Sequence, residues 1–149
     1  MTIVASAVVP LDISKAVEQL KRDEGFSRFL HKDSVGVLTI GYGIDLQSDG
    51  LSQDEAALVL QHRAWKQYRD LITALPWVKY LDEARQGVLL NMAYSLGVVG
   101  ELKFHITLDD VHEGRFAAAA DAMRASEWAR EVSPRAERLA VQMETGEWQ

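Results

Sequence analysis

The sequence predicts a mainly helical α+β fold with a small β-sheet near the N-terminus. Three observations predict it. Apolar residues recur at helical spacing before residue 24, strand formers and glycines follow, and the remaining chain carries helix start and stop signals. The chain has 149 residues, of which 48% are hydrophobic and 26% charged, as is typical of globular proteins. We therefore expect a single domain over residues 1–149.

The first expected helix covers about residues 14–24 and ends at Gly25. Its apolar stripe consists of Ile13, Val17 and Leu20. Glu24 continues this stripe, so we expect its side chain to point inward. Burial and the negative end of a helix both disfavour a carboxylate, and such conflicts gather at functional sites. Glu24 is therefore a candidate general acid, although most glutamates at such positions are partly exposed and salt-bridged.

The next segment, between Phe26 and Leu46, predicts a hairpin or small sheet with its turn at Gly36. Asp33 falls on the turn and Thr39 on the returning strand. The step between them is even, so a regular strand sets Thr39 on a defined face near the turn. With Glu24, two acids and a hydroxyl can converge on one cleft, as a hydrolytic site requires. The alternatives are that Asp33 only shapes the turn and Thr39 only favours a strand.

The rest of the chain is expected to be helical. Ser52 and Glu55 form a capping box that opens a helix over about residues 53–74, which stops before Pro76. The further expected helices cover about 82–96, ended by Gly97, then 107–112, 115–125 and 133–142, the last with Ser133 as N-cap and Pro134 following. The buried positions expected in the two longest helices are Leu58, Ala64, Trp65, Tyr68, Leu71, Ile72, Val88, Leu89, Met92 and Ala93.

Composition excludes several classes of function. There is no cysteine, and the four histidines are scattered, so we expect no metal and no cofactor. The net charge of −6, without a Lys and Arg cluster, argues against nucleic-acid binding. Met1 to Pro10 lacks the features of a signal peptide, so we expect no export by the chain's own sequence, and the alternative for these residues is a disordered or packed arm. No run approaches the ~20 apolar residues that cross a bilayer, so we expect no stable membrane insertion.

Several motifs resemble the bacteriophage lysozymes, the endolysin muramidases of glycoside hydrolase family 24. Eight residues separate Glu24 from Asp33, and five separate Asp33 from Thr39. The matching blocks are Asp23-Glu24-Gly25, Thr39-Ile40-Gly41-Tyr42-Gly43, Asn91-Met92-Ala93-Tyr94-Ser95-Leu96-Gly97, Phe104-His105-Ile106-Thr107-Leu108, Ser126-Glu127-Trp128, Pro134-Arg135-Ala136-Glu137-Arg138-Leu139-Ala140 and Thr145-Gly146-Glu147-Trp148. These blocks occur in the family's order and spacing over about residues 16–148.

The resemblance implies a lysozyme-like fold, with lobes over about residues 14–55 and 75–149, a linking helix over about 53–74 and a cleft between the lobes. It also implies hydrolysis of the β-1,4 bond between N-acetylmuramic acid and N-acetylglucosamine in peptidoglycan. Glu24 would be the general acid, and Asp33 with Thr39 would activate water. The family inverts the anomeric centre, for which the two carboxyl groups lie about 6.5 to 9.5 Å apart.

The resemblance also suggests substrate contacts. Tyr94 and Thr107 match glycan-binding positions, and Arg135 matches an arginine that pairs with the catalytic glutamate. His105 lies close to Thr107 in the same block and is a further candidate for substrate contact. Asp45 replaces an aliphatic contact of the family and is a candidate as well. The alternatives are a core aromatic for Tyr94, a helix cap for Thr107, and ordinary surface residues for Arg135 and His105. Two further departures from the family pattern are Ile44 and Ala122.

By the same resemblance, the chain would be a monomeric endolysin. It would wait in the host cytoplasm until a holin opens the inner membrane, then act in the periplasm on peptidoglycan glycan strands and cause lysis. One alternative is a virion-associated muramidase, against which we count the lack of a fused module. The other is a lysozyme-like binding module without catalysis, against which we count the complete motif.

Overall fold

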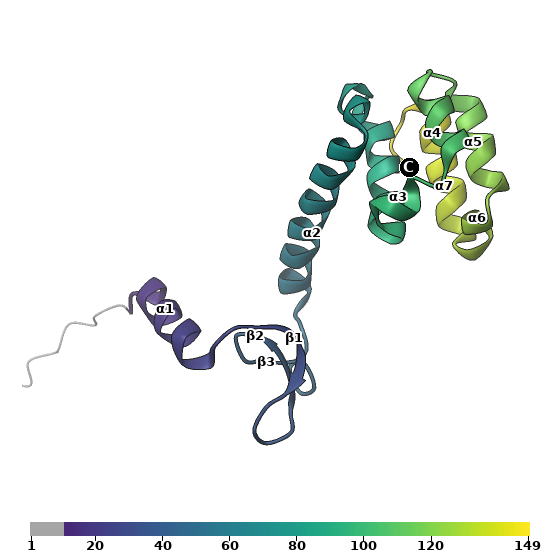
Figure 1. Ribbon diagram of the computed structural model, residues 1–149. Coiled ribbons are helices and arrows are strands. Elements are labelled where there is room, and N and C mark those ends of the chain that lie inside the picture. Colours follow the sequence, from purple (N-terminus) through teal and green to yellow (C-terminus); the bar gives the residue numbers. More distant parts are fainter. Residues whose placement is uncertain (1–10) are drawn as a thin grey trace, which may run out of the picture. The chain divides into compact units, whose positions relative to one another are not determined.

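The computed structural model describes residues 11–149, so the interpretation of Met1 to Pro10 lies outside the described residues (Figure 1). Contacts within the chain define two compact units, divided between Ala56 and Ala57. The described part is mainly helical and holds one small antiparallel sheet, which confirms the predicted α+β class. None of its helices is both long enough and apolar enough to cross a membrane.

The first unit contains one helix and a three-stranded antiparallel sheet. Helix α1 spans Ile13–Glu24, begins at the N-cap Asp12 and ends at Gly25, whose φ of 68° favours glycine. The strands are β1 (Ser27–Lys32), β2 (Leu38–Gly41) and β3 (Ile44–Asp45), in the order β1-β2-β3. Thr39 is the register partner of both His31 and Asp45. The predicted helix and hairpin are therefore confirmed.

The expectation of a buried stripe on α1 is wrong. Ile13 is 66% exposed, Leu20 is 54% exposed, and no residue of α1 is buried. Glu24 is also exposed. Helical spacing identifies one apolar side of a helix, but burial also requires an apolar layer to cover it. The short strands of the first unit offer little such surface, since Thr39 is their one buried residue.

Helix α2 spans Gln53–Ala74, and its predicted capping box is confirmed. The backbone N–H of Glu55 donates to Ser52 Oγ at 3.2 Å, and that of Ser52 donates to Glu55 Oε2 at 2.8 Å. The later elements are η1 (Pro76–Tyr80), α3 (Glu83–Glu101), α4 (His105–His112), α5 (Phe116–Ala125), α6 (Glu127–Glu131) and α7 (Ser133–Thr145). Helix α7 packs against α3, α5 and α6, and α4 packs against α5 (Figure 1).

The predicted helices are present, but several boundaries differ: α4 begins at His105 and not near residue 107, and α7 ends at Thr145 and not near residue 142. Gly97 has φ 71° and ψ 156°, so it does interrupt the helix, but helical turns resume and α3 continues to Glu101. The short elements η1 and α6 were not predicted. Ser133 is the first residue of α7 and not its N-cap, which is Val132 without a side-chain hydrogen bond. The serine therefore lies one residue too late to cap the helix.

The core lies in the second unit. Val88, Leu89, Met92 and Ala93 of α3 are completely buried, as predicted. Helix α2 contributes less than expected, because Leu71 is its one buried residue. Leu58 and Trp65 are 64% and 58% exposed, so their assignment to the core is wrong. In a helix whose apolar residues spread around the axis, periodicity does not identify the covered side.

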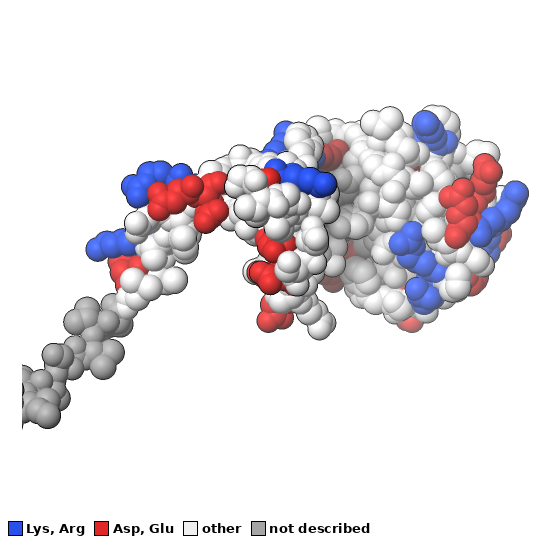
Figure 2. Space-filling view, turned by 90° about the horizontal axis from the view of Figure 1, so that it is seen from below, with Lys and Arg blue, Asp and Glu red and all other residues white. Residues whose placement is uncertain are grey.

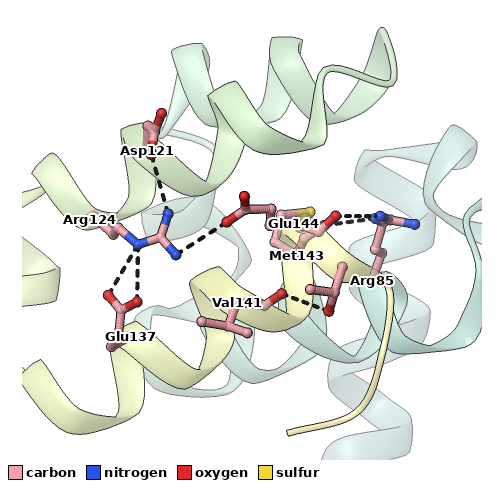
Figure 3. A network of polar contacts seen from close by, with 8 residues as sticks. Arg85, Asp121, Arg124, Glu137, Val141, Met143 and Glu144 are labelled. Atoms are coloured by element: carbon pink, nitrogen blue, oxygen red, sulfur yellow. Dashed lines mark hydrogen bonds and ion pairs between the residues drawn. The ribbon is translucent and has the colours of Figure 1, made fainter.

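Arg85 ties α3 to the C-terminal end of α7 (Figure 3). Its Nε donates to the Met143 carbonyl at 2.8 Å, and its Nη2 donates to the Glu144 carbonyl at 2.9 Å. These carbonyls belong to the last turn of α7, where no intrahelical donor is available. The guanidinium also lies 3.7 Å above the centre of the Phe116 ring. Arg85 therefore joins three helices through one largely buried cation.

We expect Arg85→Met to lower the free energy of unfolding of the second unit by about 2 to 4 kcal/mol, because charge-assisted hydrogen bonds are lost from a desolvated position. Urea titration followed by circular dichroism measures this change. Lys66→Met is the matched control, since it breaks an exposed ion pair with Asp70. It should lower the free energy of unfolding by at most about 0.5 kcal/mol. Equal losses in the two variants would contradict the role given to Arg85.

Candidate active site

Glu24, Asp33 and Thr39 line one cavity of about 300 Å³ in the first unit. The end of α1 supplies Glu24, the β1–β2 turn supplies Asp33, and β2 supplies Thr39. The other lining residues are Gly25, Phe26, Ser27, His31, Gly41 and Gly43. The structure thus brings the three candidate catalytic residues together, and it does so within one unit.

Asp33 is held by the turn that it helps to form. Its Oδ1 accepts hydrogen bonds from the backbone N–H groups of Val35 and Val37, both at 2.9 Å. Its own N–H donates to the Val37 carbonyl at 2.9 Å. Because Oδ1 has both of these partners, the orientation of the carboxylate is fixed. Among the residues described, none donates to Oδ2, so this oxygen can accept a hydrogen bond from a water molecule or a ligand.

Thr39 occupies the central strand and is 5% exposed. Its Oγ1 lies 3.3 Å from Nε2 of His31, the residue opposite it in β1. His31 also lines the cavity, although the sequence analysis did not single it out. The sequence placed the turn at Gly36, whereas the register centres it on Val35, and only this register makes positions 31 and 39 cross-strand neighbours.

Gly43 makes a close approach to Glu24. A Cβ built on Gly43 would lie 2.5 Å from Glu24 Oε2 and 3.1 Å from its Cδ, and the φ of Gly43 is 71°. Only glycine therefore fits here while the Glu24 carboxyl group keeps its position. The sequence alone does not reveal this contact, since it joins the end of a helix to the turn between β2 and β3.

We expect Gly43→Ala to lower the rate of glycan hydrolysis by about tenfold to 10²-fold, because the added methyl group displaces the Glu24 carboxyl. A displacement of a catalytic group by about 1 Å lowers reaction rates by about this factor. Gly36→Ala is the matched control. Its φ is also positive, at 90°, but a Cβ there meets nothing within 4 Å. Rate assays on soluble peptidoglycan fragments, with the melting temperature of each variant, separate displacement from backbone strain. Equal rates for both variants would contradict the contact's importance.

Asp45 has a structural task in the turn after β3. Its Oδ1 accepts hydrogen bonds from the backbone N–H groups of Gln47 and Ser48, both at 2.9 Å. The hydrogen bond from the Ser48 backbone is the largest of the effects that lower the pKa of Asp45 below its ordinary value. Asp45 is not among the lining residues of the cavity. A substrate contact by Asp45 stays a prediction.

The other proposed substrate contacts belong to the second unit. Tyr94 is 46% exposed, so the alternative of a core aromatic is wrong. Thr107 is 2% exposed inside α4, whose N-cap is Phe104, so the alternative of a helix cap is also wrong. His105 is the exposed first residue of α4. Glycan contacts by these three residues stay predictions, and Thr107 offers little surface for one.

Arg135 lies in α7, and its Nε is buried without a hydrogen-bond partner among residues 11–149. A buried guanidinium nitrogen that lacks an acceptor is costly, so this position favours an anionic partner. The predicted pairing with Glu24 stays a prediction. In the described part of the chain, no group of three or more His, Asp or Glu side chains is arranged to hold a metal ion.

Charged residues of both signs are mixed on the surface. On the face drawn in Figure 2, Lys and Arg lie beside Asp and Glu on α1, and both signs also occur on the second unit. This face shows no continuous basic area. With a net charge of −6, long-range attraction to an anionic polymer is weak, and short-range contacts must supply the affinity for such a ligand.

Comparisons with known proteins place the chain among the lysozymes. The family model for phage lysozyme matches residues 21–140. The probable T4-type lysozyme 1 of Dictyostelium discoideum is 25% identical over 163 aligned positions, which cover 90% of this chain and 96% of the relative. The pre-baseplate central spike protein Gp5 of Enterobacteria phage T4 is 26% identical over 157 positions, 87% of this chain but 27% of the relative. The match to the family model spans most of the sequence and contains Glu24, Asp33 and Thr39. The chain therefore belongs to the phage lysozyme family.

Proposed function

We propose that this chain is a muramidase that hydrolyses the β-1,4 bond between N-acetylmuramic acid and N-acetylglucosamine in bacterial peptidoglycan. Membership of the phage lysozyme family supports a muramidase-like activity. The observation that carries the finer proposal is the cavity that Glu24, Asp33 and Thr39 line together. Most glycoside hydrolases use two carboxyl groups that flank the scissile bond, and a hydroxyl beside them can help to hold the attacking water.

The proposed roles follow from the surroundings of each side chain. The Glu24 carboxyl lines the cavity and forms no hydrogen bond with another residue of the described part, so it can approach and protonate the leaving glycosidic oxygen. Asp33 is fixed through Oδ1, which leaves Oδ2 to accept a proton from the attacking water. The Thr39 hydroxyl holds the same water. The water attacks the anomeric carbon as the bond to the leaving oxygen breaks, and the two proton transfers balance the reaction.

An inverting outcome is part of this proposal. Asp33 lies on a turn and is held in place, which suits a base better than a nucleophile that must reach the sugar. With a water between Asp33 and the sugar, the β-linkage yields an α-anomer, whereas a covalent glycosyl intermediate yields a β-anomer. Proton NMR of the first product from a soluble glycan fragment decides this point. The proposal expects the α-anomer first, and a β-anomer that appears first would contradict inversion.

A zymogram on bacterial cell walls tests the activity itself. The proposal expects a clearing band for the wild type and none for Asp33→Asn, with Asp23→Asn as a control that keeps the band. Asp23 lies beside Glu24 in α1 and pairs with Arg22, but it is not among the residues that line the cavity. The absence of clearing by a folded wild-type protein would favour the alternative of a lysozyme-like binding module.

We further propose that the chain acts as an endolysin. It would remain in the host cytoplasm, as a monomer, until a holin opens the inner membrane, and then reach the peptidoglycan. The expected result is that expression in a bacterial cytoplasm leaves cells intact until the membrane is permeabilised, after which the culture clears. Lysis without permeabilisation would contradict the need for a holin.

The alternative of a virion-associated muramidase has one observation in its favour, because a relative carries the name of a central spike protein. This chain matches only 27% of that relative's length, so the likeness does not extend to most of the spike protein. Mass spectrometry of purified phage particles distinguishes the two settings. The endolysin proposal expects the chain to be absent from particles, and a stoichiometric amount would favour the alternative.

A further inference from the structure

His31 is placed to control the hydroxyl group of Thr39. It lies in β1 directly opposite Thr39 in the register of the sheet, and its Nε2 lies 3.3 Å from Thr39 Oγ1. Both side chains line the cavity that also contains Glu24 and Asp33. In the described part of the chain, His31 is the one side chain that forms a hydrogen bond with this hydroxyl. The state of the imidazole therefore decides which way the hydroxyl hydrogen points.

A threonine hydroxyl has one hydrogen to donate and two lone pairs that accept. When Nε2 of His31 carries no proton, it accepts the hydroxyl hydrogen, and the lone pairs of Oγ1 remain for the hydrogens of the attacking water. When Nε2 carries a proton, it donates to Oγ1 and the hydroxyl hydrogen is released. That hydrogen can then bond to the water oxygen, which ties up the lone pair needed for attack on the sugar.

We propose that His31 is a positioning residue that keeps the Thr39 hydroxyl as a hydrogen-bond acceptor for the attacking water. This inference rests on the proposed hydrolysis, and it adds a residue that acts through Thr39 without contacting the sugar. Histidine suits the task because Nε2 accepts a hydrogen bond in the neutral tautomer that carries its proton on Nδ1, and donates one in the protonated form. The activity should then depend on the protonation of this imidazole.

Other titratable groups lie close to His31 and Thr39. Glu24 from α1 and Asp33 from the β1–β2 turn line the cavity with it, and Asp45 of β3 is the other register partner of Thr39. The pH profile of the wild type alone therefore does not identify His31. A comparison with variants at position 31 does, because they leave these three carboxyl groups in place.

The test compares His31→Phe and His31→Gln with the wild type on a soluble glycan fragment. His31→Phe removes the hydrogen bond and should lower kcat about tenfold, the effect of one hydrogen bond, with KM changed less than about twofold. His31→Gln offers an amide oxygen to the Thr39 hydroxyl and should restore kcat to within about threefold of the wild type. Both variants remove the imidazole of His31, so any dependence of kcat on its protonation should disappear.

His62→Phe is the matched control, since it makes the same change at an exposed histidine of α2 and should leave kcat unchanged. A wild-type kcat and pH profile in His31→Phe would overturn the inference, while the loss of activity in Glu24→Gln would still support the proposed hydrolysis. A raised KM with unchanged kcat would also overturn it, because it would show direct contact with substrate.

A measurement without substrate keeps the inference testable if the chain does not hydrolyse glycan. The ¹⁵N chemical shift of His31 Nε2 reports whether this nitrogen accepts a hydrogen bond. The inference expects an accepting Nε2 in the wild type near pH 8 and a changed shift in Thr39→Val, which removes the hydroxyl with little change in shape. The same shift in both proteins would show that the hydrogen bond does not hold the imidazole, and would overturn the inference.

Discussion

Replacing Glu24 by glutamine should lower the rate of peptidoglycan hydrolysis by about 10²-fold or more. General acid catalysis contributes about 10² to 10⁴ to such reactions, and an amide of nearly the same size has no proton to give to the leaving oxygen. The substitution keeps the side chain beside Gly43, so the cavity should keep its shape. Release of soluble reducing sugar from purified peptidoglycan measures the effect.

Glu18→Gln provides the control for this experiment. Glu18 lies in the same helix, is exposed, and pairs with Lys21 away from the cavity residues. We expect this variant to hydrolyse peptidoglycan at the wild-type rate and to melt within about one degree of it, because an exposed pair contributes little to stability. Normal lysis by a folded Glu24→Gln protein would show that the assignment of the general acid is wrong.

The second large effect concerns the stability of the second unit. Glu101 is completely buried near the end of α3, and neither of its carboxyl oxygens has a hydrogen-bond partner within the described chain. Burial alone raises the pKa of Glu101 from 4.5 to about 8. The folded protein therefore holds this side chain as a neutral acid at pH 7, where a glutamate in the unfolded chain is charged.

The sign of the pH dependence follows from these two pKa values. Below about pH 4.5 Glu101 is protonated in both states and stability is unaffected. As the pH rises from 4.5 to about 8, the unfolded chain loses the proton and the folded chain keeps it, so the free energy of unfolding falls. At 1.36 kcal/mol for each pKa unit, the full loss is about 5 kcal/mol; about 4 kcal/mol of it is reached at pH 8, and it levels off at higher pH.

Glu101→Gln should remove this dependence, because the amide has a similar shape and does not ionise. We expect the variant and the wild type to be equally stable near pH 4 and the variant to be about 4 kcal/mol more stable near pH 8. Urea unfolding at several pH values, followed by circular dichroism, gives the difference. Glu131→Gln, at an exposed position of α6, should show no such trend. If the free energies of unfolding of Glu101→Gln and the wild type differ by the same amount at every pH between 5 and 8, this account is contradicted.

The elements that were predicted correctly are those with local signals. The capping box of Ser52 and Glu55, the stop before Pro76 and the helix end at Gly25 each act through contacts within a few residues. The short helix α6 was missed because its five residues are too few to show an apolar period of the helical kind. Burial was predicted less well, since it depends on what covers each helix.

The site could be predicted in part. Glu24, Asp33 and Thr39 are close in sequence, and the turn between the strands brings them to one cavity, so their spacing contained the necessary information. His31 and Gly43 could not be predicted in the same way. The role of His31 depends on the exact register of β1 and β2, and that of Gly43 depends on the approach of a turn to the end of α1. A glutamate such as Glu101 is usually a surface residue, and its burial follows only from the packing of the folded second unit.

Mass spectrometry of the fragments released from purified peptidoglycan is the most direct test of hydrolysis by an acid and a water-activating carboxylate. The account predicts fragments that end in a reducing N-acetylmuramic acid, each carrying one oxygen-18 atom when the reaction runs in labelled water. Fragments that end in anhydro-muramic acid and carry no label would contradict the account, because they would show that the sugar's own hydroxyl, and not a water held by Asp33 and Thr39, attacks the anomeric carbon.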